Sequence, residues 1–138
     1  MKDYEVVNLS RLCNVKASVL GKGAKPATGM QSLRGLPFQI GRRDGKGKDI
    51  FVGLGKGRGF SNESLTIPVN KKAKNVLFAH RLIDSELFNN GPIGVVCGTY
   101  VFKLKNGKQF EVPVRERFEI SLVPSSWGQL PLNSVPDR

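Results

Sequence analysis

The residues that could do acid–base chemistry in this chain are few. His80 is the only histidine, and the sequence has no Gly-x-Ser-x-Gly turn whose serine it could activate. Two carboxylate pairs, Asp84 with Glu86 and Glu116 with Glu119, are close in sequence. Glycoside hydrolysis needs two carboxyl groups facing each other across a cleft, and the arginines on both sides of Glu116 would hold it ionised. We therefore expect solvated or ion-paired carboxylates and no enzymatic activity.

Side chains suited to sugar binding are better represented than catalytic groups. An aromatic ring can stack on the C–H face of a pyranose, while Arg, Asn and His side chains pair with its hydroxyl groups. Trp127 is the only tryptophan, and it is interpreted either as a stacking ring or as a plug over an open end of the fold. For the arginines at 115 and 117, ion pairs with the neighbouring glutamates are the alternative role. The candidate ligand-binding residues are Trp127, His80, Arg81, Arg115, Arg117, Asn89 and Asn90.

Metal and phosphate chemistry have little support in the sequence. A chain with one histidine and no Cys-x-x-Cys spacing lacks the ligand pattern of a zinc site. Cys13 and Cys97 are expected to be buried, reduced thiols, although a count of two leaves a disulfide open. The glycine-rich residues 53–60 are followed by a strand pattern, whereas a phosphate-binding loop is followed by a helix. We therefore expect these residues to form an ordinary loop.

The charge balance is the clearest compositional signal. The chain has 22 Lys and Arg against 11 Asp and Glu, a net charge of +11, and much of the excess lies between residues 22 and 74. Such a charge favours anionic partners, among them acidic polysaccharides and nucleic acids. Solubility and protection of strand edges are the alternative explanation. The basic loops hold few aromatic residues on which bases could stack, so nucleic acid is the less favoured partner.

The elements that position these residues are expected to be short strands. Strands are predicted at residues 4–7, 36–41, 49–54, 64–69 and 75–80, the last as a buried central strand. One helical turn is expected at residues 10–14, and loops at 21–35 and 81–92. Because short strands recur and no long helical pattern appears, the sequence predicts an all-β fold, an antiparallel β-sandwich of jelly-roll type.

The segment from 98 to 120 contains the strongest hairpin signal, an Asn-Gly pair between two long strand patterns. A three-residue loop ending at Gly107 places the apolar residues of both strands on one face, whereas a two-residue loop sets them opposite polar ones. We therefore predict a left-handed Gly107 next to a bulge. The expected register pairs Tyr100 with Val112 and Phe102 with Phe110.

The length of 138 residues suits a single domain, and we expect one over 1–138, excised from or appended to a larger protein. No apolar run is long enough to cross a bilayer, so no membrane partner is expected. The first residues lack the apolar core of a signal peptide.

Four motifs together carry a family resemblance: GLPFQIG, SLTIPVNKKAKNVLFAH, GTYVFKLKNGKQFEVPVRERFEI and the closing WGQLPLNSVPD. In this order they resemble galactose-binding-like β-sandwich modules that are attached to bacterial polysaccharide-degrading enzymes. The resemblance implies a non-catalytic, monomeric module that binds glycans through loops at one end of the sandwich. It also implies a neighbouring catalytic domain, an extracellular or periplasmic location where the parent enzyme is secreted, and a structural calcium. No dense Asp and Asn cluster marks such a calcium site here.

The sequence therefore predicts a carbohydrate-binding module that targets a polysaccharide or oligosaccharide, with the basic loops suggesting an acidic one. Two other classes remain open. The first is a structural accessory domain that packs on a catalytic domain. The second is a basic polyanion- or nucleic-acid-binding protein, whose binding would weaken steeply with salt.

Overall fold

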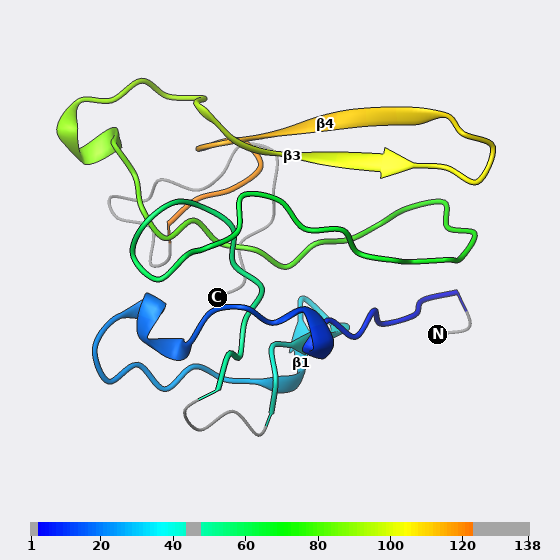
Figure 1. The fold of residues 1–138 in the computed structure, drawn as a ribbon, viewed down its shortest axis with the longest axis horizontal. Helices are drawn as coiled ribbons and strands as arrows, with labels where there is room; N and C mark the ends of the chain where they lie inside the picture. Colours follow the sequence, from blue (N-terminus) through cyan, green and yellow to red (C-terminus); the bar gives the residue numbers. More distant parts are fainter. Residues whose placement is uncertain (1–2, 44–47, 123–138) are drawn as a thin grey trace. The chain divides into compact units, whose positions relative to one another are not determined.

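The computed structural model describes residues 3–43 and 48–122, and Figure 1 shows its fold. The chain divides into two compact units, Met1–Leu77 and Phe78–Arg138, which we call unit 1 and unit 2 and describe separately. Strands account for 29% of the residues and helices for 8%, and both sheets are antiparallel. This low helical content is compatible with the predicted all-β class. The sandwich arrangement and the single domain over 1–138 stay predictions.

Unit 1 contains one tight hairpin, formed by β1 (Gly29–Leu33) and β2 (Leu36–Ile40). Its two turn residues, Arg34 and Gly35, have φ angles of 53° and 80°. Two left-handed residues between antiparallel strands are the mark of a type I′ turn, which matches the twist of the strands it joins. The prediction of β2 is confirmed, whereas the loop predicted for residues 21–35 was wrong where it includes β1.

The core of unit 1 forms where Val15 meets the segment around Ile50. These side chains are only 2% and 6% exposed. The two segments share a short antiparallel bridge, in which the Ile50 amide donates to the Val15 carbonyl at 2.8 Å. The Asn14 side chain extends the pairing, since its Oδ1 accepts from the Gly53 amide at 2.7 Å and its Nδ2 donates to the Gly53 carbonyl at 2.9 Å. In place of the strand predicted at 49–54, the structure has an isolated β-bridge at Phe51, and the Asn14 side chain supplies the next pair of hydrogen bonds at Gly53.

The other expected elements of unit 1 are partly present. The 3₁₀ helix η1 (Ser10–Leu12) confirms the predicted helical turn, and a second one, η2 (Ala17–Leu20), was not expected. Residues 4–7 and 64–69 join no strand ladder, so these two strand predictions were wrong. In 64–69 the side chains of Leu65 and Ile67 are less exposed than those of their neighbours, as in an alternating strand. The backbone of this segment nevertheless has no neighbouring strand to pair with among the described residues, so no ladder forms.

Unit 2 is organised by the long hairpin of β3 (Val96–Lys103) and β4 (Gln109–Arg115), drawn in yellow and orange in Figure 1. Gly107 has a φ of 84°, and its amide donates to the Leu104 carbonyl at 3.0 Å. The pairing register is the one that the apolar pattern predicts: Tyr100 pairs with Val112 and Phe102 with Phe110. The irregularity between Val96 and Gly98 is the one break in the described ladder.

The apolar run at residues 75–80 does not form the buried central strand that its composition suggested. It belongs to no described ladder, and Leu77 and Phe78 are 51% and 40% exposed. The Phe78 ring lies against the Tyr100 ring instead, with centroids 3.8 Å apart. The part of the run that belongs to unit 2 begins at Phe78. It contributes a side chain to one face of the hairpin and does not add a strand to the edge of the sheet. Composition alone does not separate these two outcomes.

The connection from Phe78 to β3 makes a wide turn that includes the 3₁₀ helix η3 (Leu87–Asn89) (Figure 1). A parallel bridge between Leu82 and Leu122 ties the start of this connection to the last described residues. The buried residues of the described part of unit 2 are Val114 and Glu116, which are 6% and 5% exposed. Among the described residues of the chain, no helix has the length and apolar character needed to cross a bilayer.

Candidate ligand-binding site

One face of the β3–β4 hairpin collects aromatic rings. Phe78 stacks on Tyr100 with an interplanar angle of 11°, and Phe102 stacks on Phe110 with centroids 4.9 Å apart. The two stacks meet between Tyr100 and Phe102, whose centroids are 6.4 Å apart. We call Phe78, Tyr100, Phe102 and Phe110 the aromatic face. It is not closed off, because Phe78 and Phe110 are 40% and 51% exposed.

His80 adjoins this face and is held at both ring nitrogens. Its Nε2 lies 2.8 Å from the Glu119 carbonyl oxygen, and its Nδ1 contacts the Tyr100 hydroxyl. A carbonyl oxygen only accepts, so Nε2 carries a proton and donates to it. Burial raises the pKa of Tyr100 to about 12, so its hydroxyl stays protonated well above neutral pH. Both ring nitrogens of His80 are thus engaged within unit 2.

The chain turns at the end of β4, and we call residues 115–120, which begin with the last residue of that strand, the 115–120 loop. Arg115 pairs with Glu119: Nη2 lies 2.5 Å from Oε1, and the Arg115 backbone amide donates to Oε2 at 2.9 Å. The Phe118 ring lies against the guanidinium, 4.4 Å from its carbon atom. Donating these hydrogen bonds to the Glu119 carboxylate raises the pKa of Arg115. The ion pair considered as the alternative role of Arg115 is therefore present, and its ligand contact stays a prediction.

Arg117 differs from Arg115 in its surroundings. Its Nη1 atom is buried and, in the part of the chain described, has no hydrogen-bond partner. Its backbone lies in the left-handed region, with a φ of 72°. The carboxylate of the adjacent Glu116 does not accept a hydrogen bond from this Nη1 atom. It accepts one from the Ser85 hydroxyl instead. The loop thus holds one arginine in an ion pair and one with an unsatisfied donor.

The remaining predicted site residues are less closely connected. Arg81 follows His80 directly and is exposed. Asn89 ends η3, where its Nδ2 donates to Glu86 Oε2 at 3.3 Å, and Asn90 caps the helix with a φ of 61°. Trp127 lies outside the described residues. The structure therefore brings His80, Arg115 and Arg117 to one loop and leaves the asparagines exposed in the preceding connection.

Sequence reasoning missed the residues that give the site its character. Phe78 and Phe110 were placed in predicted strands without a binding role, and Tyr100 was considered only for the register of the hairpin. The hairpin register could have placed Phe110 with Phe102 on one face, because alternate residues share a face. No local signal could have brought Phe78 there, since its position comes from a segment that lacks strand pairing.

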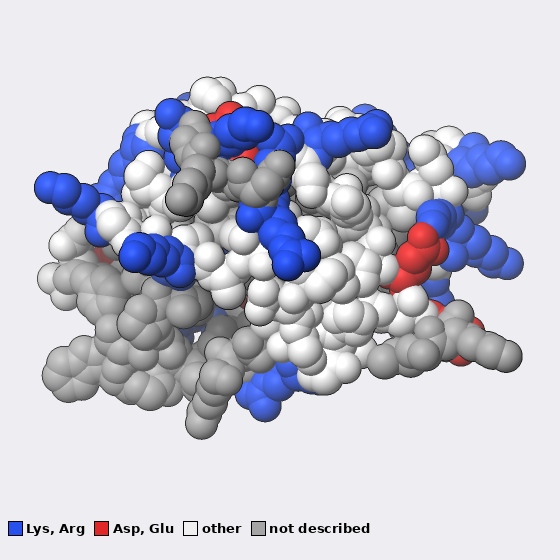
Figure 2. Space-filling view, turned by 90° about the horizontal axis from the view of Figure 1, so that it is seen from below, with Lys and Arg blue, Asp and Glu red and all other residues white. Residues whose placement is uncertain are grey.

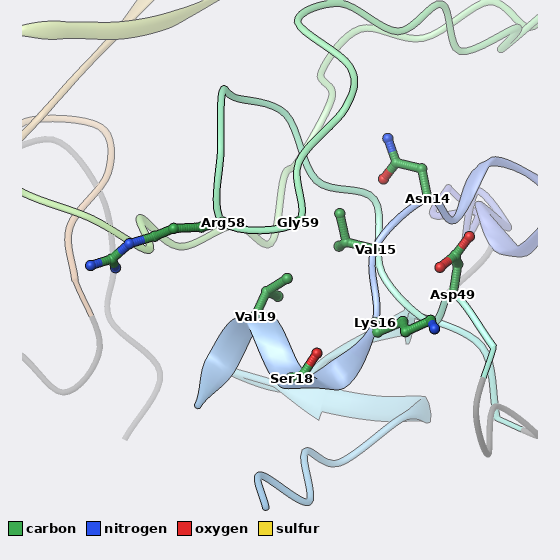
Figure 3. A pocket seen from close by; sticks show the side chains of 8 residues that line it. All are labelled: Asn14, Val15, Lys16, Ser18, Val19, Asp49, Arg58 and Gly59. Carbon is green, nitrogen blue, oxygen red and sulfur yellow. The ribbon is translucent and has the colours of Figure 1, made fainter. Parts of the chain in front are cut away.

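A separate cavity of about 310 Å³ lies in unit 1, between η2 and the glycine-rich loop. Figure 3 shows its lining, in which the Arg58 side chain points away from the other labelled side chains. The amide of Asn14, another lining residue, is already bonded to Gly53. Lys16, Ser18 and Asp49 then supply its polar side chains. One cation beside one carboxylate is a poor match for a densely anionic ligand.

Neither cysteine forms a disulfide. Cys13 is partly buried, with its Sγ 3.4 Å from the Ile50 carbonyl oxygen. Cys97 is exposed, so its expected burial was wrong. It sits at the ladder irregularity between Val96 and Gly98, where its side chain does not follow the regular alternation of the strand.

The described residues contain no group of three or more His, Cys, Asp or Glu that could hold a metal ion. The two glutamates of the 115–120 loop are engaged by Ser85 and Arg115. A calcium site needs six to eight oxygen ligands, many of them from carboxylates. The part of the chain described therefore does not fit the structural calcium that the family resemblance implies.

Comparison with protein-family models, with curated proteins and with solved structures finds no match to this chain. The resemblance to galactose-binding-like modules accordingly rests on the sequence motifs alone. The functional assignment has to come from the chemistry of the site.

Proposed function

We propose that this chain is a non-catalytic carbohydrate-binding module that binds a polysaccharide or oligosaccharide. Its fold would be the antiparallel β-sandwich of jelly-roll, galactose-binding-like type. The aromatic face of unit 2 carries the proposal, since rings that remain 40% and 51% exposed offer flat apolar surface to the C–H face of a sugar. An attached catalytic domain would then be held on its polysaccharide.

Polar side chains of unit 2 would bind the hydroxyl groups of a sugar that stacks on the aromatic face. His80 is fixed beside Tyr100, whereas Arg115 ends β4, the strand that carries Phe110, and Arg117 lies two residues further on. Hydrogen bonds to hydroxyl groups give orientation and specificity, while the apolar contact contributes much of the affinity. A flat apolar surface with a few fixed donors at its edge is therefore suited to a sugar ring.

The same contacts argue against catalysis at this place. Glu116 is bonded to Ser85, Glu119 is paired with Arg115, and both nitrogens of His80 are engaged. A general acid or base must reach the proton that it transfers, directly or through one water. These groups serve the loop's own structure, and binding without turnover fits them better.

The test is a glycan array followed by calorimetry on the glycans that bind. Phe110→Ala should weaken binding about tenfold or more, because it removes the most exposed ring measured on the aromatic face. Val101→Ala is the matched control: Val101 is 44% exposed on the opposite face of the same hairpin. Unchanged affinity for Phe110→Ala and Phe78→Ala, with both variants folded by circular dichroism, would overturn the aromatic face as the site.

Polyanion binding is the second candidate, and the charge distribution favours it. Figure 2 shows one face on which Lys and Arg side chains project at many separate points and Asp and Glu are few. Binding that depends on such charges weakens steeply as salt rises, whereas stacking and hydroxyl pairing change little. Calorimetry at about 0.05 M and about 0.5 M salt separates the two candidates.

A further inference from the structure

Arg117 combines two unusual features at one residue. Within residues 3–43 and 48–122, its Nη1 is buried without a hydrogen bond, although buried polar groups in folded proteins are nearly always paired. Its φ of 72° is uncommon for a residue with a side chain. Backbone in such regions tends to collect at functional sites, where the surrounding structure holds it in place.

The 115–120 loop does hold it in place. The Arg117 amide donates to the Ile120 carbonyl at 2.9 Å. The Arg115 carbonyl accepts from the amides of Phe118 and Glu119, each at 3.1 Å. These bonds close the loop on itself on both sides of Arg117. The side chain is therefore presented from a fixed backbone, which lowers the conformational cost of binding a ligand.

The acids of the loop leave the donor unsatisfied. Glu119 is occupied by Arg115, and Glu116, though adjacent in sequence, is bonded to Ser85. Glu116 contributes negative charge near Arg117 but no hydrogen bond to Nη1. A partner from outside the loop is therefore needed, and the planar fork of a guanidinium matches a carboxylate or a sulfate group.

We infer that Arg117 is an anion contact for the glycan, and that the glycan bears carboxylate or sulfate groups. The inference rests on the proposed carbohydrate-binding function. One sugar ring of an oligosaccharide would lie on the aromatic face, while the anionic substituent of another ring pairs with the guanidinium beyond the end of β4. Since Nη1 itself is covered, binding entails a local movement of the groups over it. The net charge of +11 favours the approach of such a ligand.

The test uses glycan pairs that differ only in charge. Galacturonate oligosaccharides are compared with their methyl esters, and κ-carrageenan oligosaccharides with their desulfated forms, by calorimetry on the intact chain. The wild type should bind the anionic member of at least one pair about tenfold more tightly, at both low and high salt. The first pair reports on carboxylate and the second on sulfate. Equal affinity within both pairs overturns the inference without needing any variant.

Variants then locate the effect. Arg117→Gln should remove the preference for the anionic member and leave the neutral member within about twofold. Arg117→Lys, which keeps the charge but loses the fork, should retain part of the preference. Lys103→Gln, on the far face of the hairpin, is the control for general charge and should change neither member. A preference that survives Arg117→Gln overturns the role of Arg117.

The outcomes separate the two proposals. If no member of either pair binds, or if Phe110→Ala leaves all affinities unchanged, the proposed function itself is wrong at this site. If both members bind equally and Phe110→Ala weakens both, the function stands and the anion contact is wrong.

Discussion

The two units of this protein carry different chemistry. Unit 1 holds 15 Lys and Arg and 5 Asp and Glu, a difference of 10, whereas unit 2 holds 7 and 6, a difference of 1. Nearly all of the net charge therefore belongs to unit 1. The aromatic face, by contrast, belongs to unit 2. A long-range attraction for anions and a short-range sugar contact would thus come from separate parts of the chain, and substitutions can separate them.

The units also differ in what holds them together. In unit 1, the Asn14 side chain bonds to the backbone of Gly53, and two glycines, Gly41 and Gly53, are in close contact with neighbouring groups. In unit 2, rings stack on a regular hairpin and charged side chains close the 115–120 loop. We conclude that unit 1 depends on close backbone approach and unit 2 on side-chain pairing.

The largest effect is expected for Gly41→Ala in unit 1. A Cβ there would lie 2.3 Å from the Ile50 carbonyl oxygen, and the φ of 55° is itself strained for alanine. Overpacking against backbone and the strained φ together should cost about 3 kcal/mol of unfolding free energy. Gly35→Ala is the matched control: it has a φ of 80° but no atom within 4 Å, and it should cost about 1 kcal/mol. Urea denaturation measures both, and equal costs would show that close approach does not matter in unit 1.

A smaller effect is expected for Glu119→Ala in unit 2. It removes the partner of the Arg115 guanidinium and of the Arg115 amide, so hydrogen exchange of the 115–120 loop should rise. The expected loss of stability is about 2 kcal/mol. Glu63→Ala breaks the exposed pair with Lys56, whose atoms are 2.9 Å apart, and should cost less than about 0.5 kcal/mol. Faster exchange in unit 1 after Glu119→Ala would argue against the separate roles of the units.

The charge contrast predicts unequal effects of two triple variants. Changing Lys22, Lys25 and Lys72 of unit 1 to Gln should lower affinity for a heparin column and reduce the salt dependence of retention, by about tenfold in affinity at low salt. The matched change in unit 2, at Lys103, Lys105 and Lys108, removes the same number of charges. Its effect should be smaller, because unit 2 carries little net charge. Equal losses would mean that polyanions do not distinguish the units.

The smallest effect concerns pH. Tyr100 has its pKa raised from 10.0 to about 12 by burial, so the folded state holds this proton more tightly than the unfolded state. The resulting stability is fully present below pH 10 and is lost as the pH rises through about 12. Tyrosinate absorbance should show one late-titrating tyrosine that disappears in Tyr100→Phe. A titration of that tyrosine near pH 10 would mean that Tyr100 is not buried in the folded state.

The sequence predicted the hairpin of unit 2 in detail because three independent signals agreed there. Alternating apolar residues, an Asn-Gly pair and the face shared by Phe102 and Phe110 allow only one register. The run at 75–80 had only its composition, which fits a central strand and a covering segment equally well. The β1–β2 hairpin was missed because its turn is Arg34-Gly35. Left-handed turn positions are usually occupied by Gly, Asn or Asp, so an arginine does not indicate one.

The candidate site was predictable in its residue types and not in its arrangement. His80 and Arg115 were selected for their chemistry, and both are held by Glu119, one through its backbone and one through its side chain. Such convergence depends on how a loop folds, which residue spacing does not reveal. The unsatisfied Nη1 of Arg117 is a property of three-dimensional surroundings, and no sequence pattern could have indicated it.

The bond from His80 to the Glu119 carbonyl joins positions that are 39 residues apart. Forming this contact closes a loop of that length and costs conformational entropy, as a disulfide would, but a single hydrogen bond opposes reopening far more weakly. In a unit whose described core is small, order over long sequence distances would then depend on a few polar crosslinks. Loss of this imidazole should therefore loosen residues 78–80 and the 115–120 loop together, as one cooperative element.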